Sequence, residues 1–172
     1  MRFKGECSRA HDPNWAWRPL SGAGAALRGR RFNWPGLETL YLSLSFNTVF
    51  REVSGGFAYR LTPCVLCSYD VDCEGVADLR TDADRAALGV ALSDLDCAWG
   101  DALIAGREPE SWAVVRRLIA DGHAGVLVPS FANGATGDDQ NLVLWRWGPE
   151  LPHKVMVYDP TGKLPKNQPS WK

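Results

Sequence analysis

Apolar and polar positions alternate near residue 40 and then change to a helical spacing. Leucines alternate with more polar residues over 40–45, which predicts a half-buried strand with Tyr41 on its more polar face. Asn47 suits the N-cap of a following helix, whose predicted buried stripe comprises Val49, Phe50 and Val53. Glu52 lies outside this apolar stripe, so its carboxylate is available for a role in binding or catalysis.

Apolar runs elsewhere predict the remaining elements. Further strands are expected over residues 65–71, 125–129, 141–147 and 154–158, and helices over 23–27, 82–89 and 112–122, with a short turn near 93–99. Because these elements follow no regular βαβ rhythm, the pattern predicts an α+β fold with a central mixed or antiparallel sheet and flanking helices. No repeat or linker divides residues 1–172, so we expect one domain with a tail over about 161–172.

Composition limits the possible partners and compartments. The formal net charge of −1 provides no basic excess for binding nucleic acid directly. No run reaches the roughly 18 apolar residues of a membrane span, and the first residues lack the apolar core of a signal peptide. We therefore expect a cytoplasmic protein without membrane contact. The five cysteines are an odd number, which favours buried reduced thiols over disulfides or a metal site.

Common catalytic and nucleotide-binding motifs are absent from the sequence. The Gly22–Gly24 pair lacks the third glycine of a dinucleotide-binding loop, no Walker sequence occurs, and no G-x-S-x-G motif surrounds a serine. Asp138 and Asp139 lie in a glycine-containing loop, where paired carboxylates are usually solvated. These exclusions leave the segment around residues 30–52 as the main candidate for chemistry.

That segment places two arginines, a tyrosine and a glutamate close together. Arg30 and Arg31 lie between glycines, where the backbone can approach a ligand closely. Arginine suits bidentate phosphate contacts, although the sequence does not decide which of the two makes them. Together with Tyr41 and Glu52, the pair suits a phosphate-bearing substrate with a cationic leaving group. Ser130, at the end of a predicted buried strand, is a further site candidate.

Several segments, taken in order over about residues 18–147, resemble the RES domain. They are residues 18–25, 31–33, 40–45, Glu52, 128–130 and 141–144. The family is named after an arginine, a glutamate and a serine, which correspond here to Arg31, Glu52 and Ser130. The resemblance implies a fold similar to the diphtheria-toxin branch of ADP-ribosyltransferases, with NAD+ as substrate and no metal.

The resemblance also implies a biological role. RES domains are toxins of bacterial type II toxin–antitoxin pairs, whose Xre-like helix-turn-helix antitoxins occlude the active site. They consume NAD+ by transferring ADP-ribose to water, phosphate or a protein target, and the acceptor for this chain stays open. The alternative is a non-catalytic module that binds only an antitoxin or a nucleotide.

The implied site has four principal residues. Glu52 stabilises the positive charge that develops on the ribose, and Arg31, with help from Arg30, binds the diphosphate. Tyr41 stacks on the nicotinamide, and Ser130 hydrogen-bonds the ribose or fixes Glu52. Asn33, which follows Arg31 in the matching segment, is expected among the NAD+-binding residues.

Overall fold

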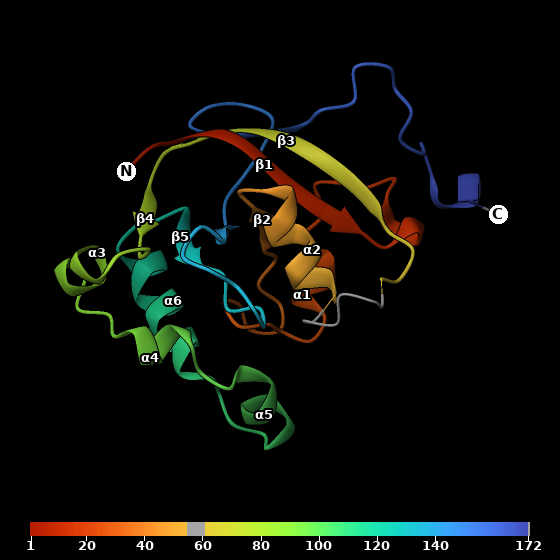
Figure 1. Cartoon of the computed structure of the whole chain (residues 1–172). Helices are drawn as coiled ribbons and strands as arrows, with labels where there is room; N and C mark the ends of the chain where they lie inside the picture. Colours follow the sequence, from red (N-terminus) through yellow and green to blue (C-terminus); the bar gives the residue numbers. More distant parts are fainter. Residues whose placement is uncertain (55–60, 172) are drawn as a thin grey trace.

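Seven strands form one mixed sheet in the order β4-β5-β6-β2-β1-β3-β7 (Figure 1). The computed structural model describes residues 1–54 and 61–171. The strands are β1 (Phe3–His11), β2 (Leu40–Ser43), β3 (Val65–Cys73), β4 (Val76–Asp78), β5 (Gly125–Pro129), β6 (Gln140–Leu144) and β7 (His153–Val157). All neighbouring strands are antiparallel except β4 and β5. The sheet and its helices confirm the predicted α+β class.

Strand β1 lies near the middle of the sheet, although the sequence pattern did not predict it. It pairs with β3 along its whole length, from Phe3 opposite Cys73 to His11 opposite Val65, and Figure 1 shows these two strands side by side. With β2 it shares only the pair Ser8 and Ser43. The sheet therefore opens between β1 and β2.

Short helices accompany the sheet. They are α1 (Ala23–Ala26), α2 (Phe46–Ser54), α3 (Asp82–Ala87), α4 (Leu92–Leu95), α5 (Trp99–Ile104) and α6 (Glu110–Ala120), with 3-10 turns at Pro13–Trp15 and Gln168–Trp171. Helices α3, α4 and α6 gather beside β4 and β5, whereas α5 lies at the end of an extended arm (Figure 1). The arm, residues 95–106, runs from the end of α4 through α5.

Two apolar clusters pack on opposite faces of the sheet. Alternation along the strands divides them: Leu127 and Leu142 join one cluster, and Val126 and Val143 join the other. Helix α6 covers the second cluster with its buried apolar stripe. Tyr41 packs against this second cluster and is half-buried, so its face of β2 is only partly open to water.

The predicted buried stripe of α2 is partly wrong. Val49 is buried, but Phe50 is 45% and Val53 39% exposed. The helix turns Thr48 inward instead, because the Thr48 hydroxyl donates a 2.9 Å hydrogen bond to the buried carboxylate of Asp139. A polar contact that the local sequence does not reveal therefore sets the orientation of α2.

Candidate active site

A cleft of about 670 Å³ lies where β1 and β2 separate. Its charged lining residues are Arg9, Arg30, Arg31 and Glu52, and its aromatic lining residues are Phe32, Tyr41, Trp99 and Phe131. Four of the residues singled out from the sequence thus share one cavity. The arrangement combines positive charge, aromatic faces and one carboxylate, which suits an anionic ligand with a flat ring.

Glu52, on α2, is held by two hydrogen bonds to the same oxygen. Ser130 Oγ donates to Glu52 Oε1 at 2.7 Å, and Asn141 Nδ2 donates to it at 2.5 Å. Ser130 follows β5 and is buried, whereas Asn141 lies on β6, so neighbouring strands supply the two donors. Because both bonds reach Oε1, the second oxygen of this exposed glutamate is left for a ligand.

Asn33 lies beneath the cleft and is not part of its lining. Its side chain is fully buried, and its Nδ2 donates to the carbonyl oxygens of Ala25, Trp34 and Leu37 at 3.0–3.2 Å. The bonds fold the segment after Arg31 into a fixed turn. Asn33 thus positions its neighbours through the backbone.

Tyr41 is tied to the same turn by its hydroxyl. The hydroxyl accepts a hydrogen bond from the Phe32 amide at 3.1 Å and donates one to Asn33 Oδ1 at 2.9 Å. Burial is the main cause of a raised pKa at Tyr41, so the phenol is neutral at physiological pH. With its hydroxyl engaged, Tyr41 offers the cleft an aromatic ring.

Arg31 connects the cleft to the arm. Its Nη1 donates to the carbonyl oxygens of Leu95 and Cys97, both at 2.8 Å, and lies 3.9 Å from Asp96 Oδ1. The guanidinium also lies 4.7 Å from the centre of the Phe131 ring, a cation–π contact. Burial lowers the pKa of Arg31, but an arginine remains charged at any physiological pH. Arg31 therefore makes most of its polar contacts with groups of the protein itself. Its neighbour Arg30, in contrast, is exposed.

Comparison with known protein families identifies the family of this chain. The model of the RES domain family matches residues 6–167, nearly the whole chain. The chain belongs to the RES domain family. This family is associated with NAD-utilising enzymes. No curated protein matches the chain. Within residues 1–54 and 61–171, no helix of this RES domain is long and apolar enough to cross a membrane.

The RES domain also contains a buried carboxylate, Asp139, for which the prediction from the sequence was wrong. Asp139 was expected to be solvated, but it is buried and accepts hydrogen bonds from Thr48 Oγ1, Thr136 N and Thr136 Oγ1 at 2.8–3.0 Å. Arg51 Nε lies 3.2 Å from Asp139 Oδ2, an ion pair without hydrogen-bond alignment. These contacts, led by the Thr136 amide, lower the Asp139 pKa and fix α2 against the loop after Ser130. Of the two neighbouring aspartates, Asp138 is exposed, as predicted, and Asp139 is not.

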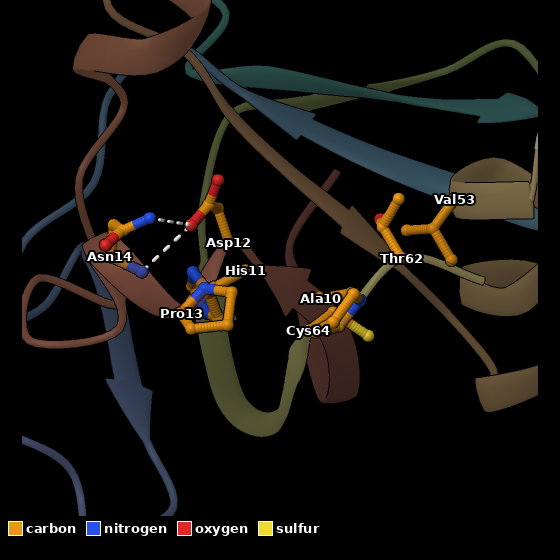
Figure 2. A pocket seen from close by; sticks show the side chains of 9 residues that line it. Ala10, His11, Asp12, Pro13, Asn14, Val53, Thr62 and Cys64 are labelled. Carbon is orange, nitrogen blue, oxygen red and sulfur yellow. Dashed lines mark hydrogen bonds between the residues drawn. The ribbon is translucent and has the colours of Figure 1, made fainter. Parts of the chain in front are cut away.

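A second cavity of about 460 Å³ adjoins the cleft of the RES domain (Figure 2). Both cavities are lined by Ala10, Val53 and Thr62. His11 contributes to the second one, where burial and the nearby Arg9 lower its pKa to about 4 and keep it neutral. Asp12 Oδ1 accepts bonds from the amide and side chain of Asn14 at 2.9 and 3.0 Å. With His11 neutral and Asp12 negative, the described lining of the second cavity carries no positive charge. The arginines that could bind an anion line the larger cleft.

Proposed function

We propose that this RES domain cleaves the nicotinamide–ribose bond of NAD+ and transfers the ADP-ribose to an acceptor. The observation that carries the proposal is the Glu52 carboxylate, which Ser130 and Asn141 hold in a cleft lined by arginines and aromatic rings. Membership of a family associated with NAD-utilising enzymes supports the choice of substrate.

Glu52 stabilises the reacting ribose in this mechanism. As the glycosidic bond breaks, its electron pair moves to the pyridinium, which leaves as neutral nicotinamide, and positive charge grows on the ribose. A fixed carboxylate lowers the energy of that oxocarbenium-like state because it needs no reorganisation. The oxygen not bonded to Ser130 and Asn141 is suited to accept a hydrogen bond from a ribose hydroxyl.

Aromatic and cationic side chains bind the rest of the substrate. The anchored ring of Tyr41 packs against the nicotinamide and keeps water from that face. The positive side chains of the cleft offset the two negative charges of the diphosphate. The acceptor attacks the ribose carbon with a lone pair and then loses its proton, which completes the transfer.

The family resemblance extends the proposal to a biological role. We infer a toxin of a bacterial toxin–antitoxin pair, acting in the cytoplasm and held inactive when an Xre-type antitoxin covers the cleft. Water or phosphate as acceptor would deplete NAD+, whereas a protein acceptor would make the enzyme a mono-ADP-ribosyltransferase. No metal takes part in the proposed mechanism.

Nicotinamide release from NAD+ by the purified protein tests the reaction. We expect release by the wild type and by Glu150→Gln, an exposed glutamate outside the cleft, and strong loss in Glu52→Gln. Folded wild-type protein that binds NAD+ but releases no nicotinamide would support the non-catalytic binding module instead. Adding a cell lysate and NAD+ labelled in its adenylate part identifies the acceptor, because a labelled protein band forms only in protein modification.

A further inference from the structure

The buried carboxylate of Asp139 connects the helix that carries Glu52 to the loop between β5 and β6. Its side chain is 4% exposed and does not line the cleft. Its Oδ1 accepts the 2.9 Å hydrogen bond from Thr48, and Arg51 Nε lies 3.2 Å from Oδ2. Thr48 and Arg51 precede Glu52 by four residues and one residue on α2. Asp139 therefore holds the helical turn that leads to Glu52.

The main chain of Asp139 holds one of the two donors to Glu52 and leads into the other. Its carbonyl oxygen accepts a 2.7 Å hydrogen bond from the Ser130 amide, and Asn141 follows two residues later on β6. The Thr136 amide and hydroxyl donate to Asp139 Oδ2 at 2.8 and 3.0 Å, which ties the loop to the same side chain. One residue is thus connected to the helix of the Glu52 carboxylate and to both groups that hold it.

The Thr48–Asp139 bond is separate from the contacts that begin α2. Ser45 Oγ accepts the Thr48 amide at 3.1 Å, so Ser45, and not the predicted Asn47, caps the helix. This cap uses the main chain of Thr48 and does not need its side chain. Loss of the Thr48 hydroxyl therefore leaves the helix capped but removes a contact between α2 and the loop.

We infer that Asp139 is a positioning residue for Glu52, acting through Thr48 and Arg51 on α2 and through Ser130 on the loop. Glu52 lies on a helix and its donors lie on other elements, so their alignment depends on how α2 packs against the loop. Hydrogen bonds weaken steeply when their geometry is disturbed, and a misplacement of about 1 Å can reduce a catalytic rate about 100-fold. The inference rests on the proposed function, because it assigns Asp139 a part in the turnover of NAD+.

Thr48→Val tests the inference by kinetics, because valine has a similar shape to threonine but lacks the hydroxyl. We expect kcat for nicotinamide release to fall about tenfold and KM for NAD+ to change less than about twofold, since Glu52 acts mainly on the transition state. Thr48→Ser keeps the hydroxyl and should retain most of the wild-type kcat. The matched control is Thr39→Val, which alters another fully buried threonine outside the cleft and should leave kcat unchanged.

The side-chain amide of Asn141 provides a measurement that does not depend on activity. It donates to Glu52 Oε1, so its NMR signals, assigned by their loss in Asn141→Ala, report on that contact. We expect Thr48→Val to shift these signals toward their positions in Glu52→Ala. Asp139→Asn should reproduce both changes, because it puts an NH2 group in place of one of the two oxygens that accept hydrogen bonds.

The outcomes separate this inference from the proposed function. Wild-type kcat or unshifted Asn141 signals in folded Thr48→Val would overturn the positioning role, as would an equal fall of kcat in Thr39→Val. If the wild type releases no nicotinamide, the proposed function fails, and the Asn141 signals still decide whether the contacts of Asp139 position Glu52. If Thr48→Val does not fold, as judged by its melting curve, Arg51→Gln decides: unshifted Asn141 signals overturn the inference, and a shift toward Glu52→Ala supports it.

Discussion

The two sides of the cleft are built from different kinds of contacts. The side-chain hydrogen bonds of Asn33 and Tyr41 join residues close in sequence: the Tyr41 hydroxyl bonds to positions eight and nine residues away. Around Glu52, they join residues 78 to 91 apart, from Ser130 and Asn141 to the Thr48–Asp139 pair. The bonds of the first set lie within one segment of the chain, whereas those of the second set require the assembled sheet.

Because of this difference, we expect damage to the two sides of the cleft to affect different properties of the protein. The local side is held mainly by buried, uncharged hydrogen bonds around Asn33, so damage there should first reduce the stability of the fold. The long-range side converges on two carboxylates, Glu52 and Asp139, so damage there should either lower turnover or remove a stabilisation that depends on the charge of the carboxylate. The following variants test this division.

The largest expected effect, on kcat, comes from removing the two hydrogen bonds that hold the Glu52 carboxylate. The double variant Ser130→Ala/Asn141→Ala removes both donors to Oε1 and should lower kcat for nicotinamide release by about 100-fold or more, since each charge-assisted bond contributes about 1.5–3 kcal/mol. In a Glu52→Gln background the same two substitutions should lower kcat far less, because the carboxylate that the two donors hold is no longer present. Equal losses in both backgrounds would show that the donors act independently of Glu52.

On the local side, Asn33→Ala should lower the free energy of unfolding by about 3 kcal/mol. The substitution leaves buried carbonyl oxygens without their donor and releases the Tyr41 hydroxyl. Urea denaturation measures the change, with the exposed Asn47→Ala as control, for which we expect a change within about 0.5 kcal/mol. A loss of activity at wild-type stability would instead indicate direct contact between Asn33 and substrate.

Asp139→Asn should reduce stability by about 2 kcal/mol at neutral pH, with a clear pH dependence. The Asp139 pKa is held below its ordinary value of 3.8, so its stabilisation is present above pH 3.8 and disappears as the pH falls through the folded-state pKa. The stability difference between wild type and variant should therefore shrink below pH 4. Asp138→Asn, at an exposed neighbour, is the control, and a difference that stays constant with pH would contradict this role for the Asp139 charge.

The smallest effect is expected for Tyr41→Phe, which keeps the ring. Loss of the bonds to Phe32 N and Asn33 Oδ1 should cost about 1 kcal/mol in urea denaturation, less than Asn33→Ala. Tyr158→Phe, which alters a tyrosine that is 66% exposed, should leave stability unchanged. A larger loss for Tyr41→Phe than for Asn33→Ala would reverse the order proposed for this turn.

The sequence revealed those parts of the molecule whose signals are local. The apolar run that forms β5 and the alternation of β2 were predicted because each carries its own pattern. Strand β1 was not, since it is a central strand of mostly polar residues stabilised by its neighbours. The same reason hid Arg9, which looks like any other charged residue in a polar stretch.

Long-range contacts account for what was missed in the site. Arg30, Arg31, Tyr41 and Glu52 share the predicted segment, and the structure places all four on one cleft. Nothing near Asp139 in sequence shows that Thr48, 91 residues earlier, turns inward to meet it. Burial of that pair depends on the closed sheet, which a local pattern does not encode.

The attachment of the arm has a consequence for sequence variation. Arg31 bonds to main-chain carbonyl oxygens at Leu95 and Cys97, and every amino acid supplies such an oxygen. Substitutions in the exposed positions of the arm therefore leave its anchor intact. Trp99, which the arm brings to the cleft, can be exchanged for other side chains on the same support. One arginine thus allows the rim of the cleft to diversify while the groups around Glu52 stay in place.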